Sequence, residues 1–475
     1  MIKKKLQQFC NLIENKFEFD VRAFSLFRIA LGLIIVLDLA IRATDLTAFY
    51  TEDGILPFGT LSSNFNSHFH IPVYELNDSF SFVLFLFIVQ FLAALLLILG
   101  RWVKISQVVL LLFYISLDLR NPFIAQGGDD LLRVLIFWSL FLPMDQFYCF
   151  KKKNNFQIKY LGFPAFAFLL QIVFVYFFSA LLKSSSEWHS DATALYYAFS
   201  IDQIQLKPAK YLLQFPDLLQ SFTRLAYYIE LLIPLLFIVP FKNNTMRMLA
   251  ISILLIFHLF ITATLFVGLF SIISCIAFIP FISTKWMDKF DSIFNNPYTF
   301  KNEPIQANFS STILALIFLF FVLGINHKNL SQKKIGLHRE IVNSSYFFGI
   351  NQNWGMFAPD VYKDDGWYVY EAITNEEDTI DIFRQGEPVS FKKPANVLLE
   401  IKNDRWRKFA EQLTQSNNSW IQQYFCDYLF ENWNANNPTI QIKSLRLIYM
   451  LEKTPAFGKV AEVKKVVLWD YKPRK

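Results

Sequence analysis

VFVYFFSALLKSSSEWHSDATALYYAFS, residues 173–200, is the stretch from which the fold and the site of this chain can be predicted. Its apolar first part ends in a single cation, Lys183. Three serines, Glu187 and Trp188 follow, and a second aromatic run begins after Asp191. The apolar part belongs to a segment long enough to cross the hydrocarbon core of a bilayer. We therefore predict a membrane helix whose mouth carries a cation and a polar, aromatic rim, and we expect the chemistry at that mouth.

The composition of the whole chain indicates a membrane protein. Of its 475 residues, 54% are hydrophobic and 18% aromatic, and the mean hydropathy is +0.33, whereas soluble domains are about 45–50% apolar. The net charge of +6 is modest and falls mostly in short loops, which indicates membrane topology rather than nucleic-acid binding. The four cysteines show no CxxC spacing, so neither a disulfide framework nor a zinc site is expected.

Apolar segments of spanning length recur along the first two thirds of the chain. We predict an all-α polytopic membrane bundle of about nine transmembrane helices embedded in the lipid bilayer. The predicted spans are residues 23–41, 80–100, 105–119, 131–144, 161–182, 221–240, 247–264, 266–282 and 308–325. A basic surface helix is expected at 1–20, the transmembrane domain over 21–325, and an α+β domain outside the membrane over 326–475.

The distribution of positive charge predicts the orientation of the bundle. Nine spans would place one set of Lys- and Arg-bearing loops on the same side of the membrane. These loops carry Lys3–Lys5, Arg101 and Lys104, Lys151–Lys153, Lys242 and Arg247, and Lys285 and Lys289. Because positive loops stay in the cytoplasm, the N-terminus is expected in the cytoplasm and the C-terminal domain on the outer side of the inner membrane.

The C-terminal region has the patterns of an ordinary α+β fold. Period-two alternation and turn residues predict strands at 367–373, 379–383, 439–451 and 460–469. Apolar residues at helical spacing predict helices at 404–413 and 420–433. No repeat of fixed period is present, so a solenoid is excluded.

Ionisable side chains fall inside or at the ends of the predicted spans, namely Arg28, Asp38, Asp118, Arg133, Glu230 and His258. Such groups are costly in a bilayer, so they pair with each other or face a polar cavity, and the sequence is compatible with both. Arg28 and Asp38 are ten positions apart, too far to pair on one helix, so each needs a partner on another span. Pro234, four residues after Glu230, frees a backbone carbonyl next to that carboxylate, which makes Glu230 the first candidate for a cavity wall.

Seven short motifs occur in order between about residues 20 and 385. They are DGILP at Asp53–Pro57, RNP at Arg120–Pro122, GGDDLLR at Gly127–Arg133, FLP at Phe141–Pro143, Lys183 and Trp188 with TALYY at Thr193–Tyr197, ELLIP at Glu230–Pro234, and NWGMFAP at Asn353–Pro359. With these motifs in this order, the chain resembles the HTTM family of bacterial membrane proteins, which is related to the vitamin K-dependent gamma-carboxylase.

The resemblance implies a quinol-dependent enzyme that modifies a peptide or protein on the outer side of the membrane. In the carboxylase, a lysine in a Lys-x-x-x-x-Trp pattern deprotonates reduced vitamin K, and Lys183 and Trp188 match that pattern. The implied cofactor is reduced vitamin K or menaquinol, with O2 and CO2 and without a metal. Desolvation at the end of an apolar helix can bring the pKa of a lysine from about 10.4 toward the roughly 7–8 that suits a general base. The alternative is a lysine that marks the membrane edge by snorkelling.

The Gly127–Asp130 segment has two explanations. Asp129 or Asp130 caps the helix that follows, where negative charge is favoured. Alternatively, one of these carboxylates meets Lys183 across the outer mouth as an acid–base pair, which would keep the lysine charged and oppose its use as a base. A second pattern, His68 and His70, could share a metal ion, but no third ligand is evident and no metal site is expected.

Two functions follow from these patterns. The first is an enzyme with Lys183 as base, in which Trp188, Tyr197 and Glu230 line the cavity and Arg28 or Arg133 holds a carboxylate of the substrate. The second is a non-enzymatic maturation or export partner for a secreted peptide or protein, with the C-terminal domain as contact surface. Loss of function in Lys183→Ala would favour the first, and loss only on deletion of 340–475 the second. An ion-coupled transporter is a third function, for which no inverted repeat is visible.

Overall fold

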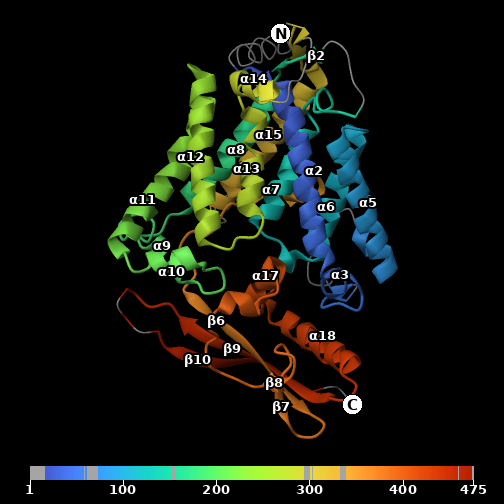
Figure 1. The fold of residues 1–475 in the computed structure, drawn as a ribbon, viewed down its shortest axis with the longest axis vertical. Helices are drawn as coiled ribbons and strands as arrows, with labels where there is room; N and C mark the ends of the chain where they lie inside the picture. The colour runs from blue at the N-terminus through green and yellow to red at the C-terminus, as the bar shows by residue number, and fades with distance from the viewer. Residues whose placement is uncertain are drawn as a thin grey trace.

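The computed structural model describes residues 17–57, 59–60, 73–150, 156–293, 300–301, 303–331, 339–457, 459 and 461–472. A helical bundle and a C-terminal domain follow each other along the long axis of the molecule (Figure 1). Residues 1–16 of the predicted surface helix lie outside the described residues. Its last part is not helical, because Phe19–Asp20 forms strand β1, which pairs with β3 (Lys159–Leu161).

Among the described residues, six helices are long and apolar enough to cross a membrane. They are α2 (Val21–Ala43), α5 (Phe80–Leu99), α8 (Phe163–Leu182), α11 (Pro216–Leu232) with the 3-10 turn η3 (Ile233–Ile238), α12 (Asn243–Thr264) and α15 (Phe309–Leu330). Each coincides with a predicted span, so the prediction of a helical bundle with apolar helices of spanning length is confirmed for these six. Pro234 lies at the start of η3, where its missing N–H ends the regular helix α11.

The other three predicted spans are helical but shorter, charged or bent. The third and fourth are α6 (Val103–Arg120), with three charged residues, and α7 (Gly127–Ser139), with 13 residues. Every residue of α7 from Leu131 to Ser139 is buried, so the bundle surrounds this short helix. The eighth span ends early at α13 (Phe270–Ile276), and the chain turns by 102° between η4 (Ile279–Phe281) and α14 (Thr284–Ile293). Pro280 in η4 accounts for this break.

Close helix packing in the bundle depends on Gly32 in α2. A Cβ at this position would lie 2.5 Å from the Ile98 side chain of α5, so any larger residue would push the two helices apart. Of the predicted positive loops, the one with Arg247 and the one that leads into α14 meet at one end of the bundle. There Arg247 donates to the backbone oxygen of Glu18, and Arg22 pairs with Asp20 and with Asp291 of α14.

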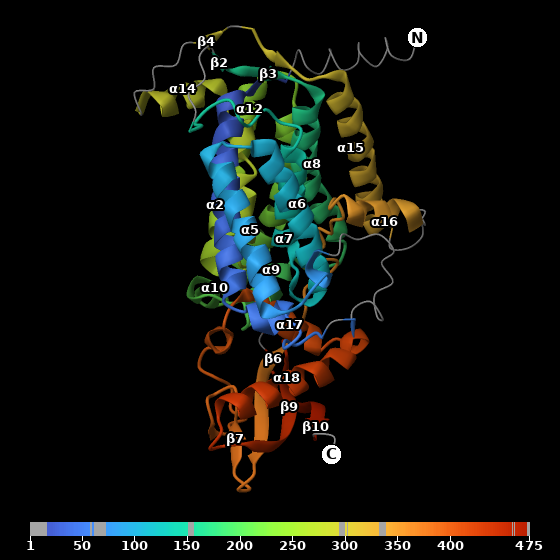
Figure 2. The ribbon, with the colours of Figure 1, turned by 90° about the vertical axis from the view of Figure 1, so that its right-hand side faces the viewer.

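Short strands close the same end of the bundle (Figure 2). They are β2 (Phe156–Gln157), which pairs with β4 (Phe300–Lys301), and β3, which pairs with β1 and β5 (Ile305–Gln306). The remaining helical segments are α3 (Leu46–Tyr50), η1 (Val73–Glu75), η2 (Pro122–Ile124), α9 (Ala194–Ser200), α10 (Lys207–Leu212) and α16 (Arg339–Phe347).

The C-terminal domain is built on an antiparallel five-stranded sheet of order β10-β9-β6-β7-β8. The strands are β6 (Asp364–Thr374), β7 (Thr379–Asp381), β8 (Glu387–Pro388), β9 (Ile442–Lys453) and β10 (Val463–Tyr471). Its helical segments are η5 (Val397–Glu400), α17 (Asp404–Leu413), η6 (Ser416–Asn418) and α18 (Trp420–Asn436). The predicted strands and helices of this region are therefore confirmed. Helix α17 lies between the sheet and the bundle (Figures 1 and 2).

Candidate functional site

A cavity of about 340 Å³ lies between α8, α11, α12 and the segment that connects α16 to the C-terminal domain. Most of its wall is apolar or aromatic, with contributions such as Phe222 from α11 and Phe257 from α12. Lys183 and Glu230 are the charged side chains among the described lining residues. We call this space the Lys183 cavity. The volume and the mostly apolar wall are those of a site for a small molecule.

The amine of Lys183 is buried at the end of α8. Lys183 is 3% exposed and follows directly after the last helical residue. Its Nζ donates to Oε2 of Glu230 at 2.5 Å and to Oγ of Ser179, one turn earlier on α8, at 2.7 Å. The Nζ also lies 5.1 Å from the centre of the Trp188 ring, within reach of a cation–π contact. A buried ammonium requires this kind of partnership, so a snorkelling lysine is excluded by the geometry.

The rim of the cavity is held by the chain after α16. Nε1 of Trp188 donates to the backbone oxygen of Phe357 at 2.9 Å. Nearby, Glu187 accepts from the backbone N–H of Val361 at 3.0 Å and pairs with Lys363. The segment around Phe357 therefore fixes the orientation of the indole ring above the lysine.

His258 and Tyr176 form a second polar pair in the wall of the Lys183 cavity. Nε2 of His258 and the hydroxyl of Tyr176 are 2.6 Å apart. Nδ1 of His258 is buried and has no hydrogen-bond partner among the described residues. His258 is recognisable from the sequence as an intramembrane ionisable group, but the sequence assigns neither His258 nor Tyr176 nor Ser179 to the site. In the sequence, these three residues are recognisable only as polar residues within apolar helices. That pattern does not show which neighbouring helix each side chain faces.

The Lys183 cavity reaches the surface between α11 and α12. Leu225 of α11 and Ile256 of α12 both line it, and they are 53% and 67% exposed. The two helices diverge toward the end of the bundle that carries α9 and α10 (Figure 1). In a bilayer, these exposed apolar side chains would face lipid, so the cavity has a sideways opening rather than one through the C-terminal domain alone.

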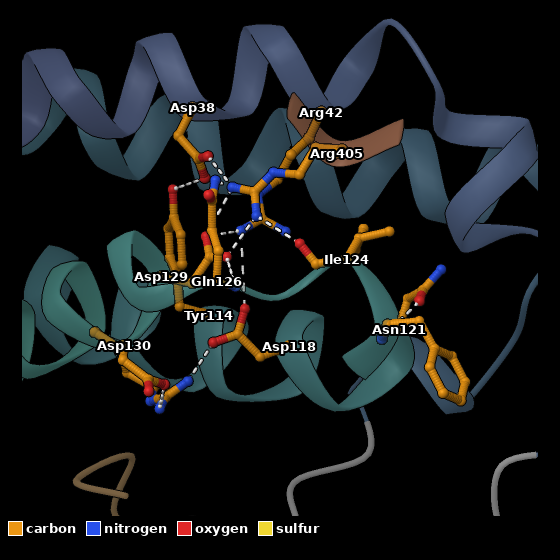
Figure 3. A network of polar contacts seen from close by, with 12 residues as sticks. Asp38, Arg42, Tyr114, Asp118, Asn121, Ile124, Gln126, Asp129, Asp130 and Arg405 are labelled. Carbon is orange, nitrogen blue, oxygen red and sulfur yellow. Dashed lines mark hydrogen bonds and ion pairs between the residues drawn. The ribbon is translucent and has the colours of Figure 1, made fainter. Parts of the chain in front are cut away.

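Asp129 and Asp130 do not contact Lys183, which corrects the second explanation of the Gly127–Asp130 segment. Asp129 caps α7 by accepting from the backbone N–H of Gln126 at 2.8 Å, as the first explanation predicted. Its carboxylate also accepts from Arg42 of α2 at 2.6 Å and pairs with Arg405 of α17 (Figure 3). These guanidinium groups satisfy Asp129, so it has no role in the Lys183 cavity.

The contacts of Asp129 belong to a buried network that joins the bundle to the C-terminal domain (Figure 3). We call it the interdomain ion cluster, and it consists of Asp38, Arg42, Asp118, Asp129, Asp130, Arg133 and Arg405. Arg405 donates to Asp38 at 2.7 Å, and Arg42 donates to the same carboxylate at 2.7 Å. Three of the six ionisable groups predicted in the spans, Asp38, Asp118 and Arg133, therefore belong to structural ion pairs.

Arg28 and Arg133 lie outside the wall of the Lys183 cavity, so neither is placed to hold a substrate carboxylate there, contrary to the expectation from the sequence. Arg133 pairs with Asp118 and Asp130 in the interdomain ion cluster. Arg28 donates to five backbone oxygens, those of Leu97, Ile98, Met144, Phe147 and Tyr148. The five N–H groups of Arg28 are all used in these bonds, and Arg133 also donates to the backbone oxygens of Gly349 and Asn351.

Tyr197 is also absent from the wall of the Lys183 cavity. Its ring lies 4.6 Å from the amine of Lys363, on the side of the C-terminal domain. Lys183, Trp188 and Glu230 are thus the predicted site residues that the structure brings together. His68 and His70 lie outside the described residues. Within the described part of the chain, no three His, Cys, Asp or Glu side chains are placed to share a metal ion.

Comparisons of the chain with protein-family models, with curated proteins and with solved structures find no match.

Proposed function

We propose that this chain is a membrane enzyme in which Lys183 and Glu230 form the acid–base pair and a lipid-soluble quinol is the cofactor. The observation that carries this proposal is the buried amine of Lys183 at the end of an apolar cavity, hydrogen-bonded to one carboxylate. A lysine–glutamate pair in such a place can exist as an ion pair or as a neutral amine and acid. A buried, hydrogen-bonded pair of ionisable groups in an apolar cavity has the geometry that acid–base chemistry requires.

Proton transfer within the pair would produce the base. Glu230 takes the proton of Lys183, and the resulting neutral amine can accept a proton from a hydroxyl group of the substrate. The oxyanion that forms then lies beside the new ammonium, whose charge the Trp188 ring also stabilises. Exclusion of water by an apolar substrate favours the neutral form of the pair, because a low dielectric penalises separated charges.

The residues of the cavity fit reduced vitamin K or menaquinol. The aromatic and aliphatic wall suits a fused ring, and the opening at Leu225 and Ile256 would let an isoprenoid tail remain in lipid. Such a quinol would supply oxidisable hydroxyl groups, with O2 and CO2 as co-substrates in the reaction that the family resemblance implies. Lys183 would hold the proton at the hydroxyl oxygen, and Trp188 would position the ring.

The proposal includes an orientation with about nine membrane segments, counting α6, α7 and α13 with the six long helices. The N-terminus would be cytoplasmic and the C-terminal domain on the outer side of the inner membrane. The positive loop of Arg247 and the one that leads into α14 lie together at the end opposite the C-terminal domain, which supports this orientation. The Lys183 cavity would then open on the outer half of the bilayer.

Replacement of Lys183 tests the proposed function. In nanodiscs that contain menaquinol, we expect Lys183→Met to lower O2-dependent menaquinol oxidation by about 10²–10⁴-fold, the usual contribution of a general base. Lys207→Met, which removes an exposed lysine on α10, is the matched control and should leave the rate unchanged. Equal rates for wild type and a folded Lys183→Met protein would refute the proposal.

A non-enzymatic partner for a secreted protein is the second candidate function. Val463 and Val467 are exposed on β10, the strand at one edge of the five-stranded sheet, and an exposed apolar edge strand favours pairing with another chain. If the chain is such a partner, Val467→Lys should abolish its function, because a charge on the edge strand opposes pairing. If the chain is the proposed enzyme, Val467→Lys should leave menaquinol oxidation unchanged.

A further inference from the structure

The C-terminal domain meets the bundle at two separate junctions. One is the interdomain ion cluster, in which Arg405 of α17 reaches Asp38 and Asp129. The other is the contact between the turn after α9, at Asp202 and Gln203, and the start of β6, and we call it the β6 junction. A cavity of about 600 Å³ lies between them, lined by α17 on one side and by residues of the turn on another. We call this space the interdomain cavity.

Two hydrogen bonds among the described residues join the turn to β6. The backbone N–H of Asp202 donates to Oδ2 of Asp365 at 2.7 Å. The side-chain amide of Gln203 donates to the backbone oxygen of Gly366 at 3.2 Å. Asp365 is 3% exposed, and the turn lies directly on its carboxyl group. Movement of the turn away from β6 would therefore bring this carboxyl group into contact with water.

Asp365 lies in a group of side chains with more negative than positive charge. Glu452 of β9 is its direct cross-strand partner, so the two carboxyl groups lie on the same face of the sheet, where like charges repel. Asp202 brings a third carboxylate close to them. Lys393 pairs with Asp202 at 2.5 Å and with Glu452, but it makes no ion pair with Asp365 among the described residues. Oδ1 of Asp365 is buried and, in the same part of the chain, has no hydrogen-bond partner.

The other ionisable groups around Asp365 do not supply the missing counter-ion. Burial, together with the carboxylate of Asp202, raises the pKa of Asp365 from the ordinary 3.8 to about 7. Three exposed lysines line the open pocket next to Asp365, and the phenol of a tyrosine of β9 lies near it. None of these groups is ion-paired with Asp365 in the described part of the chain. They are Lys207 and Lys210 of α10, Lys459 between β9 and β10, and Tyr449.

We infer that the β6 junction is a proton-operated latch, which holds the C-terminal domain closed against the turn after α9 when Asp365 carries a proton and opens when Asp365 is ionised. An ionised Asp365 in the closed junction is a buried charge without a counter-ion, and opening hydrates it. The interdomain ion cluster stays intact and acts as the hinge, because Arg405 pairs with both of its carboxylate partners there. The latch goes beyond the proposed function and does not depend on the chemistry of Lys183.

Proton linkage gives the direction and the size of the response. In the open state, a hydrated Asp365 has the ordinary pKa of about 3.8, whereas the closed state raises it to about 7. The closed state therefore holds the proton more tightly, and the closed-to-open ratio falls as the pH rises from about 4 to about 7 and is constant above that range. Between about pH 5 and about pH 8, this ratio should fall by about 100-fold.

Opening of the latch would change access to the Lys183 cavity. The interdomain cavity and the Lys183 cavity are neighbours with a shared wall. The shared residues are Gly127, Val267, Phe270, Asn353, Met356 and Phe357. A closed latch keeps the interdomain cavity covered, and an open latch admits water and polar solutes to this wall.

Distance measurements on the full chain in nanodiscs test the latch directly. Spin labels on non-canonical amino acids at positions 210 and 464 replace exposed lysines on α10 and β10 and leave the native cysteines unchanged. Electron–electron double resonance should show one short distance at about pH 5 and a growing population of longer distances toward about pH 8, with the 100-fold change in ratio given above. A second label pair at positions 52 and 432, beyond α3 and on α18, spans the hinge side and should not respond. Equal distance distributions of the first pair at both pH values would overturn the inference.

Variants of the junction separate the latch from a general effect of pH. Asp365→Asn keeps the shape of the side chain without a charge, so it should stay closed at both pH values. Asp364→Asn, at the exposed neighbouring position, is the matched control and should open like the wild type. Lys393→Met removes the paired cation and should move the opening to lower pH, which keeps the test decisive if Asp365→Asn does not fold. A wild-type response in Asp365→Asn, or an unchanged midpoint in Lys393→Met, would contradict the latch.

The failure of the latch and that of the proposed function give different results. Lys183→Met should keep the full pH response of the distances, because Lys183 lies outside the β6 junction. Loss of the response in a folded Lys183→Met protein would show that the pH acts in the Lys183 cavity instead. Infrared difference spectra between the two pH values provide an independent readout, since the band of a protonated carboxyl group should be lost in the wild type and be missing in Asp365→Asn.

Discussion

The position of Lys183 could be predicted from the sequence, but its partner could not. The apolar run before it and the polar segment after it predict its depth in the membrane, and the structure places it at the end of α8. Its partner could not be predicted, because Glu230 is 47 residues away and reaches the amine only through the packing of α11 against α8. Asp129 and Asp130 were equally plausible partners, since the sequence does not show that Arg42 and Arg133 would satisfy them.

The pairing of Lys183 with Glu230 predicts strong coupling between the two residues. Glu230→Leu should lower the free energy of unfolding by roughly 3–5 kcal/mol, because it leaves an ammonium buried without its counter-ion. The double variant Lys183→Met/Glu230→Leu should recover most of this loss, since neither buried charge remains. Denaturant unfolding in detergent micelles measures all three proteins, with the exposed Ser221→Ala on α11 as control. Strictly additive losses in the double variant would contradict the coupling.

At the scale of elements, apolar length and proline position predicted most of the bundle. The six long helices begin and end close to the predicted residues, because uninterrupted apolar runs have few other solutions in a bilayer. The eighth span was wrong in length, since its apolar run continues through Pro280 while the helix α13 ends at Ile276. Hydropathy measures how apolar a segment is and does not register a turn of 102°.

The divergence of α11 and α12 predicts a gate for substrates with lipid tails. Leu225→Trp should narrow the opening and slow oxidation of a long-tailed menaquinol by about tenfold, while a tail-less naphthoquinol that can approach from water is oxidised at the wild-type rate. Leu259→Trp is the matched control, because Leu259 is 65% exposed on α12 and lies outside the cavity wall. Equal slowing of both quinols would indicate a distorted cavity instead of a narrowed opening.

At the scale of the molecule, the interdomain ion cluster makes the C-terminal domain part of the bundle's structure. Arg405 supplies charge to Asp38 and Asp129, which lie on α2 and α7. Deletion of 340–475 would leave these carboxylates with Arg42 as their main counter-ion. Loss of function after this deletion would therefore report damage to the bundle, and it cannot identify a contact surface as the sequence had suggested.

Arg405→Met tests this structural dependence. We expect a loss of roughly 3–5 kcal/mol in the free energy of unfolding, since two buried carboxylates lose a partner. Arg446→Met on β9 removes an arginine whose ion pair with Asp470 is solvent-exposed, so it should unfold like the wild type. Unfolding of the detergent-solubilised protein, followed by tryptophan fluorescence, compares the two. Equal stability of Arg405→Met and Arg446→Met would show that the cluster contributes little.

Local patterns predicted the two-part architecture, but not how the parts meet. Helices, strands and the α+β class of the C-terminal domain follow from periodicity and composition, which act over short stretches of chain. Arg405 occurs in a helix of ordinary polar sequence, and nothing around it indicates that its guanidinium enters the bundle.

The sideways opening between α11 and α12 also determines the concentration that the Lys183 cavity encounters. For a molecule that arrives through the lipid, the occupancy of the cavity depends on the mole fraction of the molecule in the membrane. Its molarity in the surrounding water has little influence on this occupancy. Each methylene added to its tail favours the membrane by about 0.8 kcal/mol, close to a fourfold increase in partitioning. For the proposed enzyme, an apparent Michaelis constant would therefore change with the amount of lipid in the assay and is best expressed per mole of phospholipid.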